Sequence, residues 1–270
     1  MSITGTNSDR WLRRFRPAPA AARRLVCFPH AGGSASFYRP VAAAHPPGID
    51  VVVLQYPGRQ DRYREQCLPT VETYADQIAE ILRGEPELPT VYFGHSMGAS
   101  VAFETALRTG SASALVVSGR RAPATRRAEH FHRLADAELL REVERLGGTD
   151  TAMLDDAEMR RLALHAIRND YRAAETYRGR PEAQVDCPVV ALIGDADPKA
   201  TLAEVDRWRE HTTAAFRRKA FPGGHFYLTA HAAAVNREIS GELARAGRAP
   251  HSRQDRGATA PRTGISAASS

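Results

Sequence analysis

Residues 94–98 read Gly94-His95-Ser96-Met97-Gly98, a G-x-S-x-G motif in which glycines flank a serine. Apolar, β-forming residues precede the motif and a helix-forming run follows it. A strand that turns this sharply into a helix strains the backbone of the serine, and side chains at the two flanking positions would collide. The context therefore predicts a nucleophilic Ser96 exposed on a tight turn, with a serine that only caps the helix as the alternative.

A serine hydroxyl is a weak nucleophile at neutral pH, so Ser96 needs a general base and an acid that orients the base. On turns of this kind the acid and then the histidine follow the serine along the chain. We prefer Asp197 to Asp195 as the acid, because Pro198 holds Asp197 out of a helix. We assign His225 as the base, since it follows the last expected strand, whereas the other downstream histidines lie on helix-like segments or near the C-terminus: His211, His231 and His251.

Acyl transfer also needs two backbone N–H groups that stabilise the tetrahedral oxyanion. One belongs to the residue after the nucleophile, which is Met97, and the other to a loop after an earlier strand. Residues 28–34 form such a loop, rich in glycine, and we assign its donor to Ala31. The loop matches neither glycine pattern that cradles phosphate, G-x-x-x-x-G-K-[ST] or G-x-G-x-x-G. His30 and His95, neighbours of these groups, are expected to be structural.

Regular elements must hold these groups, and short apolar runs bounded by turn residues alternate with helix-like stretches along the chain. This alternation is typical of an α/β doubly wound fold with a mostly parallel central sheet and helices on both faces. Together with the motif at Ser96 it predicts the α/β-hydrolase fold. The expected strands are Arg24–Phe28, Asp50–Gln55, Thr90–Phe93, Ala114–Ser118, Val189–Ile193 and Ala215–Phe221. The expected helices are Ser36–Ala43, Thr70–Arg83, Met97–Arg108, Leu202–Glu210 and His231–Arg245.

One segment, from Arg120 to Arg180, is helical in pattern without a strand. Asp136–Leu146 ends at two glycines, and Asp155–Tyr177 has apolar residues at helical spacing. Because the segment follows one strand and precedes the next, we expect a helical lid insertion over the carboxyl edge of the sheet. Ordinary helices packed on a sheet face are the alternative.

The length of 270 residues fits one domain, expected at 24–245 with the lid at about 120–180. Residues 1–23 are expected to form an N-terminal arm, which Trp11 and Phe15 can dock onto the body. Residues 246–270 contain almost no large apolar side chain, so we expect a disordered tail.

The net charge of +6 lies at the two ends of the chain. Residues 1–24 carry six arginines against one aspartate, and residues 246–270 carry four against one, so the middle is slightly acidic. We therefore expect no nucleic-acid partner. No stretch is apolar enough to span a membrane, and the start has no signal-peptide pattern, so we expect a cytoplasmic protein. Three cysteines without metal-ligand spacing argue against a disulfide framework or a zinc site.

Six separated segments stand in an order that identifies a family: Arg24–Ala35, Gln55–Arg62, Gly94–Gly98, Ser118–Pro123, Gly194–Asp197 and Pro222–Phe226. They closely resemble the type II thioesterases of polyketide and nonribosomal peptide biosynthesis, over roughly Trp11 to Ala244. The small, polar stretch Ala42–Pro47 and the basic tail depart from the family pattern. These departures leave the chemistry untouched and put the partner contacts in doubt.

The resemblance implies a free-standing editing enzyme that hydrolyses stalled or wrong acyl groups from the phosphopantetheine arm of acyl carrier proteins. It implies Ser96, Asp197 and His225 as catalytic residues, a preference for short acyl groups, and no metal or cofactor beyond the pantetheine carried by the substrate. We expect a monomer. The alternatives are a small-ester carboxylesterase or lipase, a thioesterase that releases a finished product, and a non-catalytic binding protein on the same scaffold.

Overall fold

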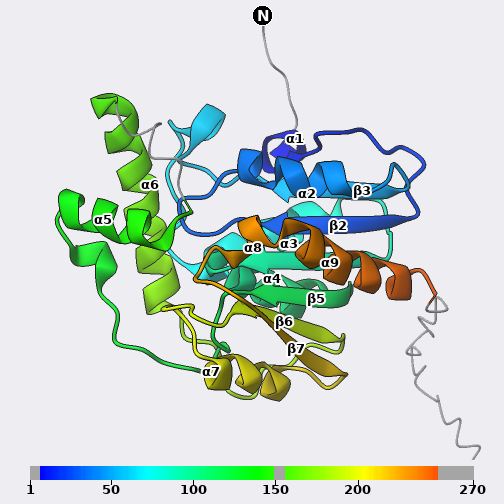
Figure 1. Ribbon diagram of the computed structural model, residues 1–270. Coiled ribbons are helices and arrows are strands. Elements are labelled where there is room, and N and C mark those ends of the chain that lie inside the picture. Colours follow the sequence, from blue (N-terminus) through cyan, green and yellow to red (C-terminus); the bar gives the residue numbers. More distant parts are fainter. Residues whose placement is uncertain (1–6, 149–155, 249–270) are drawn as a thin grey trace, which may run out of the picture.

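The structure, a computed structural model, describes residues 7–148 and 156–248. Within these residues seven strands form one sheet in the order β1-β3-β2-β4-β5-β6-β7 (Figure 1). All neighbouring strands are parallel except β1, which pairs antiparallel with β3. The strands are β1 Leu12–Arg13, β2 Arg23–Phe28, β3 Ile49–Leu54, β4 Thr90–His95, β5 Ala112–Ser118, β6 Val189–Gly194 and β7 Phe216–Phe221. The mostly parallel sheet predicted from the sequence is confirmed.

Successive side chains of the inner strands point to opposite faces of the sheet, and both faces are apolar. In β2, Val26 and Phe28 join the core on one face, while Leu25 and Cys27 join the core on the other. This double burial explains why the strands read as continuous apolar runs in the sequence.

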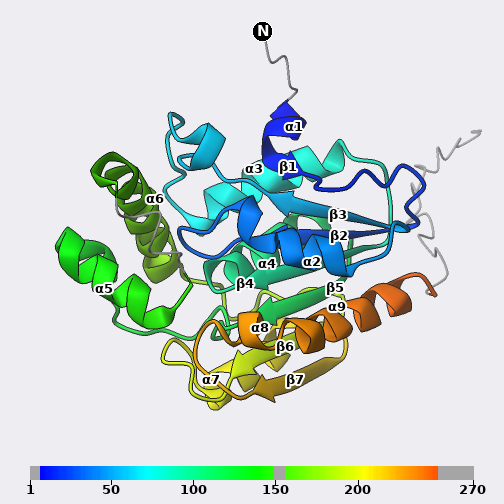
Figure 2. The same ribbon diagram turned by 45° about the horizontal axis from the view of Figure 1, so that its top comes forward.

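Helices cover both faces (Figures 1 and 2). The core that contains Val26 is covered by α3 Val71–Arg83, α4 Met97–Thr109, α7 Leu202–Asp206 and the 3₁₀ helix η5 Arg207–His211. The opposite core is covered by η1 Ala35–Tyr38, α2 Arg39–Ala44, α8 Tyr227–Ala230 and α9 Ala232–Ala246. The helix expected at 36–43 is divided into η1 and α2, and the one expected at 202–210 into α7 and η5. Further 3₁₀ turns are η2 Gln60–Arg62 and η3 Phe131–Arg133.

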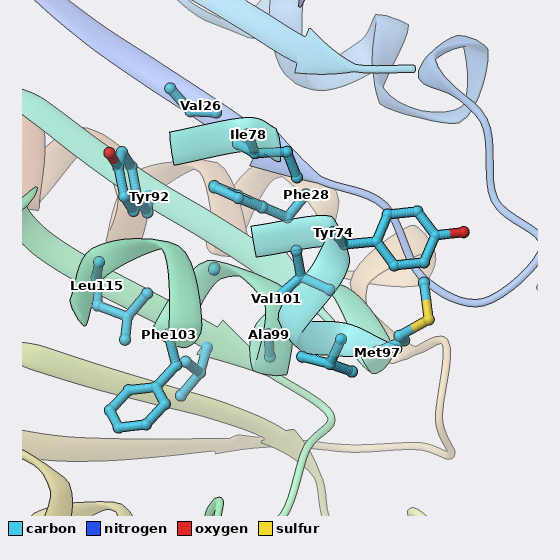
Figure 3. Packing of buried hydrophobic residues seen from close by; sticks show 14 of the residues in the cluster. Val26, Phe28, Tyr74, Ile78, Tyr92, Met97, Ala99, Val101, Phe103 and Leu115 are labelled. Atoms are coloured by element: carbon cyan, nitrogen blue, oxygen red, sulfur yellow. The ribbon is translucent and has the colours of Figure 1, made fainter. Parts of the chain in front are cut away.

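The helices α3 and α4 pack against the sheet beside the turn at Ser96, through the core that contains Val26. Figure 3 shows Ile78 of α3 next to Phe28 of β2, and Tyr74 of α3 on the side of Met97 of α4. With Val101 of α4 they belong to one buried cluster. All five side chains are fully buried. This packing fixes the start of α4, and hence the turn before it, against the carboxyl ends of β2 and β4.

Two helices lie at one end of the sheet in both ribbon views (Figures 1 and 2), and only the last part of the second joins a face, where Ala173 packs in the core that contains Val26. They are α5 Asp136–Leu146 and α6 Ala157–Thr176. They share a small core of their own, in which Leu139 of α5 packs with Ile167 and Tyr171 of α6. The helix α5 ends where predicted, at Gly147, whose φ of 82° is left-handed. Asp155, the predicted first residue of the second helix, lies outside the described residues.

Part of the expected N-terminal arm, residues 12–13, adds a strand to the sheet. Residues Asn7–Trp11 form α1, and β1 adds the antiparallel edge strand. Trp11 is 2% exposed and contacts Tyr56 edge-on, with the Arg62 guanidinium over its ring. The docking of Trp11 that we allowed for therefore occurs, since a large aromatic side chain is stabilised by burial. The expected C-terminal tail begins at Ala246, which is the last residue of α9. Residues 249–270 of that tail lie outside the described residues.

We expect Trp11→Ala to lower the free energy of unfolding by about 3–5 kcal/mol, because it removes a buried aromatic side chain and leaves a cavity. Urea denaturation followed by circular dichroism measures the loss. Tyr63→Ala is the matched control, since Tyr63 is 42% exposed, and it should change stability by less than about 0.5 kcal/mol. Equal stabilities of the two variants would show that the N-terminal segment is dispensable for the fold.

Candidate active site

The turn between β4 and α4 has the strained geometry that the motif predicts. Ser96 has φ 54° and ψ −121°, a conformation that costs a non-glycine residue about 1–3 kcal/mol. A Cβ atom on Gly94 would lie 2.3 Å from the carbonyl oxygen of Gly98, and one on Gly98 would lie 2.0 Å from that of Phe28. Neither position has room for a side chain, so both glycines are required by the close approach of the backbone.

The structure brings together the three side chains predicted to form a triad. The Nε2 atom of His225 lies 3.0 Å from the Oγ atom of Ser96, and its Nδ1 atom lies 2.9 Å from both carboxylate oxygens of Asp197. Because an ionised carboxylate only accepts hydrogen bonds, Nδ1 carries the proton and Nε2 is free to accept one from the serine. This is the arrangement of a nucleophile, a general base and an orienting acid.

The loops after β6 and β7 position the acid and the base. Asp197 is 8% exposed and also accepts a hydrogen bond of 2.8 Å from the Lys199 N–H, which fixes its carboxylate. Asp195, the alternative acid, is turned elsewhere and accepts a hydrogen bond of 2.9 Å from the Gly223 N–H. It thereby ties the loop after β6 to the loop that carries His225, so its role is to support the site.

Two further histidines lie near the base. The ring of His95 lies 4.9 Å from that of His225, and the ring of His30 packs on the other histidine, His95, at 5.9 Å. His30 and His95 are both buried. Burial lowers the pKa of His30 to about 3, with smaller contributions from His225 and Arg59, and burial also lowers the pKa of His95 well below its ordinary value. Both rings are therefore neutral, and neither opposes a positive charge on His225.

A buried hydrogen-bonded chain behind His95 was not recognised in the sequence. The Nδ1 atom of His95 and the Oγ atom of Ser118 are joined at 2.9 Å, and Ser118 is joined to the Tyr227 hydroxyl at 2.7 Å. Burial raises the pKa of Tyr227, so its hydroxyl stays neutral. The family motif contains Ser118 at the end of a strand, which was a usable signal; the position of Tyr227 depends on the tertiary fold.

The two predicted oxyanion donors lie at the same edge of the sheet. Phe28 pairs with Gly94 across β2 and β4, so the loop after β2 runs beside the turn at Ser96. Met97 is the first residue of α4, where an N–H has no acceptor inside the helix. Ala31 and Ser96 line the same cavity. These positions suit Ala31 and Met97 as donors to an oxyanion formed at Ser96.

The cavity at Ser96 is small and has charged walls. Its volume is about 50 Å³, a few times the space that one water molecule needs. Most of the charges are paired, as in the ion pairs of Arg121 with Glu129 and of Lys199 with Glu142. Arg120 differs, because no ion pair joins it to a carboxylate within the described residues. It donates hydrogen bonds to the Ser100 Oγ and the Ala174 carbonyl, and burial, together with Arg121, lowers its pKa to about 9.

A larger hollow lies on the other side of the loop that contains Ala31. It has a volume of about 730 Å³ and is bounded by Gly32 and Gly33 of that loop, by Phe37, and by apolar residues of α6 that include Leu162 and Ile167. His30 borders both this hollow and the smaller cavity. The oxyanion loop therefore separates a small, charged space from a large, mainly apolar one.

This fold and this triad define a serine hydrolase of the α/β-hydrolase type. The family described as "Thioesterase domain" matches residues 23–243, and the chain belongs to that family. Its members act on thioesters, and the present chain is a serine hydrolase of this kind.

Two relatives from streptomycetes are identical to this chain at about half of the aligned residues. The "Probable cadicidin biosynthesis thioesterase" of Streptomyces griseus is 54% identical over 87% of this chain and 66% of its own length, just under two thirds. "Thioesterase PikA5" of Streptomyces venezuelae is 49% identical over 88% of this chain and 86% of its own. The solved structure of the type II thioesterase BorB from the borrelidin biosynthetic cluster is 48% identical, with a TM-score of 0.82, over 88% of this chain and 100% of BorB.

We expect Asp197→Asn to lower kcat by about 10³–10⁴-fold, because an amide also donates and so favours the wrong tautomer of His225. Steady-state hydrolysis of an activated ester measures the change. Asp195→Asn is the matched control two residues away and should cost less than tenfold. A larger loss in the control than in Asp197→Asn would reverse the assignment of the acid.

We expect the stability of the protein to fall in acid, with His30 contributing. The folded state holds His30 neutral down to about pH 3, whereas the unfolded chain binds a proton below about pH 6.5, so stability is lost as the pH falls below 6.5. This difference in proton binding lowers the free energy of unfolding by about 2 kcal/mol between pH 7 and pH 5. Urea titrations of the wild type and of His30→Phe at both pH values test it, since the variant lacks this part of the loss. Parallel losses in the two proteins would contradict the interpretation.

Proposed function

We propose that the protein is a free-standing editing thioesterase, which hydrolyses stalled or aberrant acyl groups from the phosphopantetheine arm of carrier proteins in polyketide or nonribosomal peptide biosynthesis. The observation that carries this proposal is the hydrogen-bonded series Ser96–His225–Asp197, placed in a chain that is 48% identical to the type II thioesterase BorB over the whole of BorB. The similarity to the streptomycete biosynthetic thioesterases supports the same substrate class.

The geometry supports acyl transfer in two halves. His225 takes the proton of Ser96 as the serine oxygen attacks the thioester carbonyl, and the Ala31 and Met97 N–H groups donate to the oxyanion. The carbon–sulfur bond then breaks, and the pantetheine thiol leaves with the proton from His225. In the second half His225 takes a proton from water, the resulting oxygen attacks the acyl-enzyme, and Ser96 leaves with that proton as the free acid is released.

The proposal includes no resident metal or cofactor, because the pantetheine arrives on the substrate. The partner is an acyl carrier protein, and neither nucleic acid nor a membrane takes part. In the described residues no helix is both long and apolar enough to cross a bilayer. We place the enzyme in the cytoplasm, where carrier-bound synthesis occurs, and treat it as a monomer.

The two cavities favour short acyl groups on a long carrier arm. The space of about 50 Å³ beside Ser96 is small, whereas the hollow of about 730 Å³ has room for a much larger group and has mainly apolar walls. The Arg120 guanidinium in the small cavity offers a hydrogen-bond donor to a polar acyl group. We therefore assign the small cavity to the acyl group.

We expect kcat/KM to be highest for acyl groups on an intact carrier protein, lower for the same acyl groups on free pantetheine, and lowest for oxygen esters. The carrier adds binding energy away from the reacting carbonyl, which raises catalysis beyond what the thioester alone allows. Mass spectrometry of loaded carriers measures acyl release, and Ser96→Ala should reduce it to background.

The same panel tests the acyl preference and the alternative functions. Acetyl and propionyl carriers should be hydrolysed faster than carriers with acyl chains of eight or more carbons. A clear preference for oxygen esters would identify a carboxylesterase, and cyclised products from long substrates would identify a thioesterase that releases finished products. Turnover that is at background in the wild type as well as in Ser96→Ala would leave only a binding role.

A further inference from the structure

One carboxylate of the lid helix α6 is bound to the oxyanion loop. The Asp170 side chain is completely buried. Its Oδ2 atom accepts hydrogen bonds from the Gly32 N–H at 2.8 Å and from Arg59 Nη1 at 2.6 Å. Its Oδ1 atom accepts from Arg59 Nη2 at 3.1 Å and from the Tyr74 hydroxyl at 2.9 Å. Asp170 therefore joins α6 to three segments that are distant in the sequence.

The four donors make it possible to bury this charge. A carboxylate removed from water is costly unless it is paired and fully hydrogen-bonded. Burial lowers the pKa of Arg59, but the charge and the hydrogen bonds of Asp170, together with Tyr74 and Cys67, outweigh burial and raise the pKa above its ordinary value. Burial and the same carboxylate raise the pKa of Tyr74, which stays a neutral donor. The cluster is thus an ion pair with two neutral donors, the Tyr74 hydroxyl and the Gly32 N–H.

This cluster holds the peptide units directly after the proposed oxyanion donor. The N–H that Asp170 binds belongs to the peptide joining Ala31 to Gly32, and Arg59 Nη1 also donates to the Gly33 carbonyl at 3.3 Å. Gly32 has a left-handed φ of 73°. Because its N–H is already bound, Gly32 does not compete with Ala31 for an oxyanion.

The helix α6 also packs on the loop itself. A Cβ atom on Gly32 would lie 2.4 Å from Cγ1 of Ile167, which is three residues before Asp170 and on the same side of the helix. Van der Waals contact and the ion pair therefore fix the same peptide unit from the same helix.

We propose that Asp170 is a positioning residue for acyl transfer: through Asp170 and Arg59, the lid helix α6 holds the loop 31–33 in the conformation that aims the Ala31 N–H at the oxyanion. Full activity then requires α6 to be docked on the loop. The proposal rests on Ser96 reacting through an oxyanion and is independent of which carrier or acyl group the enzyme uses.

The test compares two double variants that both remove the buried charges. Arg59→Met with Asp170→Asn retains an oxygen that accepts from the Gly32 N–H, whereas Arg59→Met with Asp170→Leu has a side chain of similar size without an acceptor. We expect kcat for p-nitrophenyl acetate to be at least tenfold lower in the leucine variant than in the asparagine variant, because a misplaced oxyanion donor loses much of a contribution worth about 10²–10³-fold. KM should change less than kcat.

Glu242→Gln is the control for loss of a buried ion pair. Glu242 on α9 is 3% exposed and binds Arg217 and Arg245 on the other face of the sheet. It should lower the melting temperature while leaving kcat within twofold of the wild type. The use of p-nitrophenyl acetate keeps this result separate from the editing function, since a protein that fails on carriers can still report on its oxyanion hole.

A second measurement separates positioning from stability. A trifluoromethyl ketone, which forms a tetrahedral adduct with the serine, should lose affinity in the leucine variant by the same factor as kcat/KM. The corresponding methyl ketone, which binds without that adduct, should lose at most a few-fold. Should the leucine variant not fold, the single variant Asp170→Asn is compared with Glu242→Gln using the same two ketones. Equal kcat in the two double variants, or equal losses for both ketones, would overturn the proposal.

Discussion

The close approach of the start of α4 to the end of β2 is the contact on which the site depends. With no side chain on Gly98, its backbone lies against the Phe28 carbonyl, so the turn can be tight enough to expose Ser96 at the sheet edge. The cost is a strained serine backbone, and the buried packing of α3 and α4 on the sheet outweighs it. The nucleophile is therefore held by the core of the domain as well as by its own loop.

The same approach brings the oxyanion loop beside the nucleophile, because that loop continues directly from β2. The acid and the base come from the ends of β6 and β7, on the other side of β4 in the sheet. Parallel strands end at one edge, so four loops that are remote in sequence converge there. The four loops carry the oxyanion donor, the nucleophile, the acid and the base, and the order of the strands brings these loops together.

The three predicted triad residues, which the structure joins by hydrogen bonds, each have a local signature in the sequence. Ser96 stands between two glycines, Asp197 precedes a proline after a strand, and His225 follows the last strand. Asp170 had no such signature: in the helix α6 it reads as one more polar residue, and its partner Gly32 is 138 residues away. The strand β1 was missed for a similar reason, since two residues are too few to show an alternating pattern.

That two-residue strand has a consequence for the edge of the sheet. Without β1, the apolar strand β3 would be the outermost strand and would offer unpaired backbone groups to any other extended chain. The strand β1 pairs with the end of β3. Arg13 forms an ion pair with Asp61, and Arg14 forms one with Asp50, which lies farther along β3. The short strand β1 and the two arginines thus cover the end of β3, where another extended chain could otherwise pair.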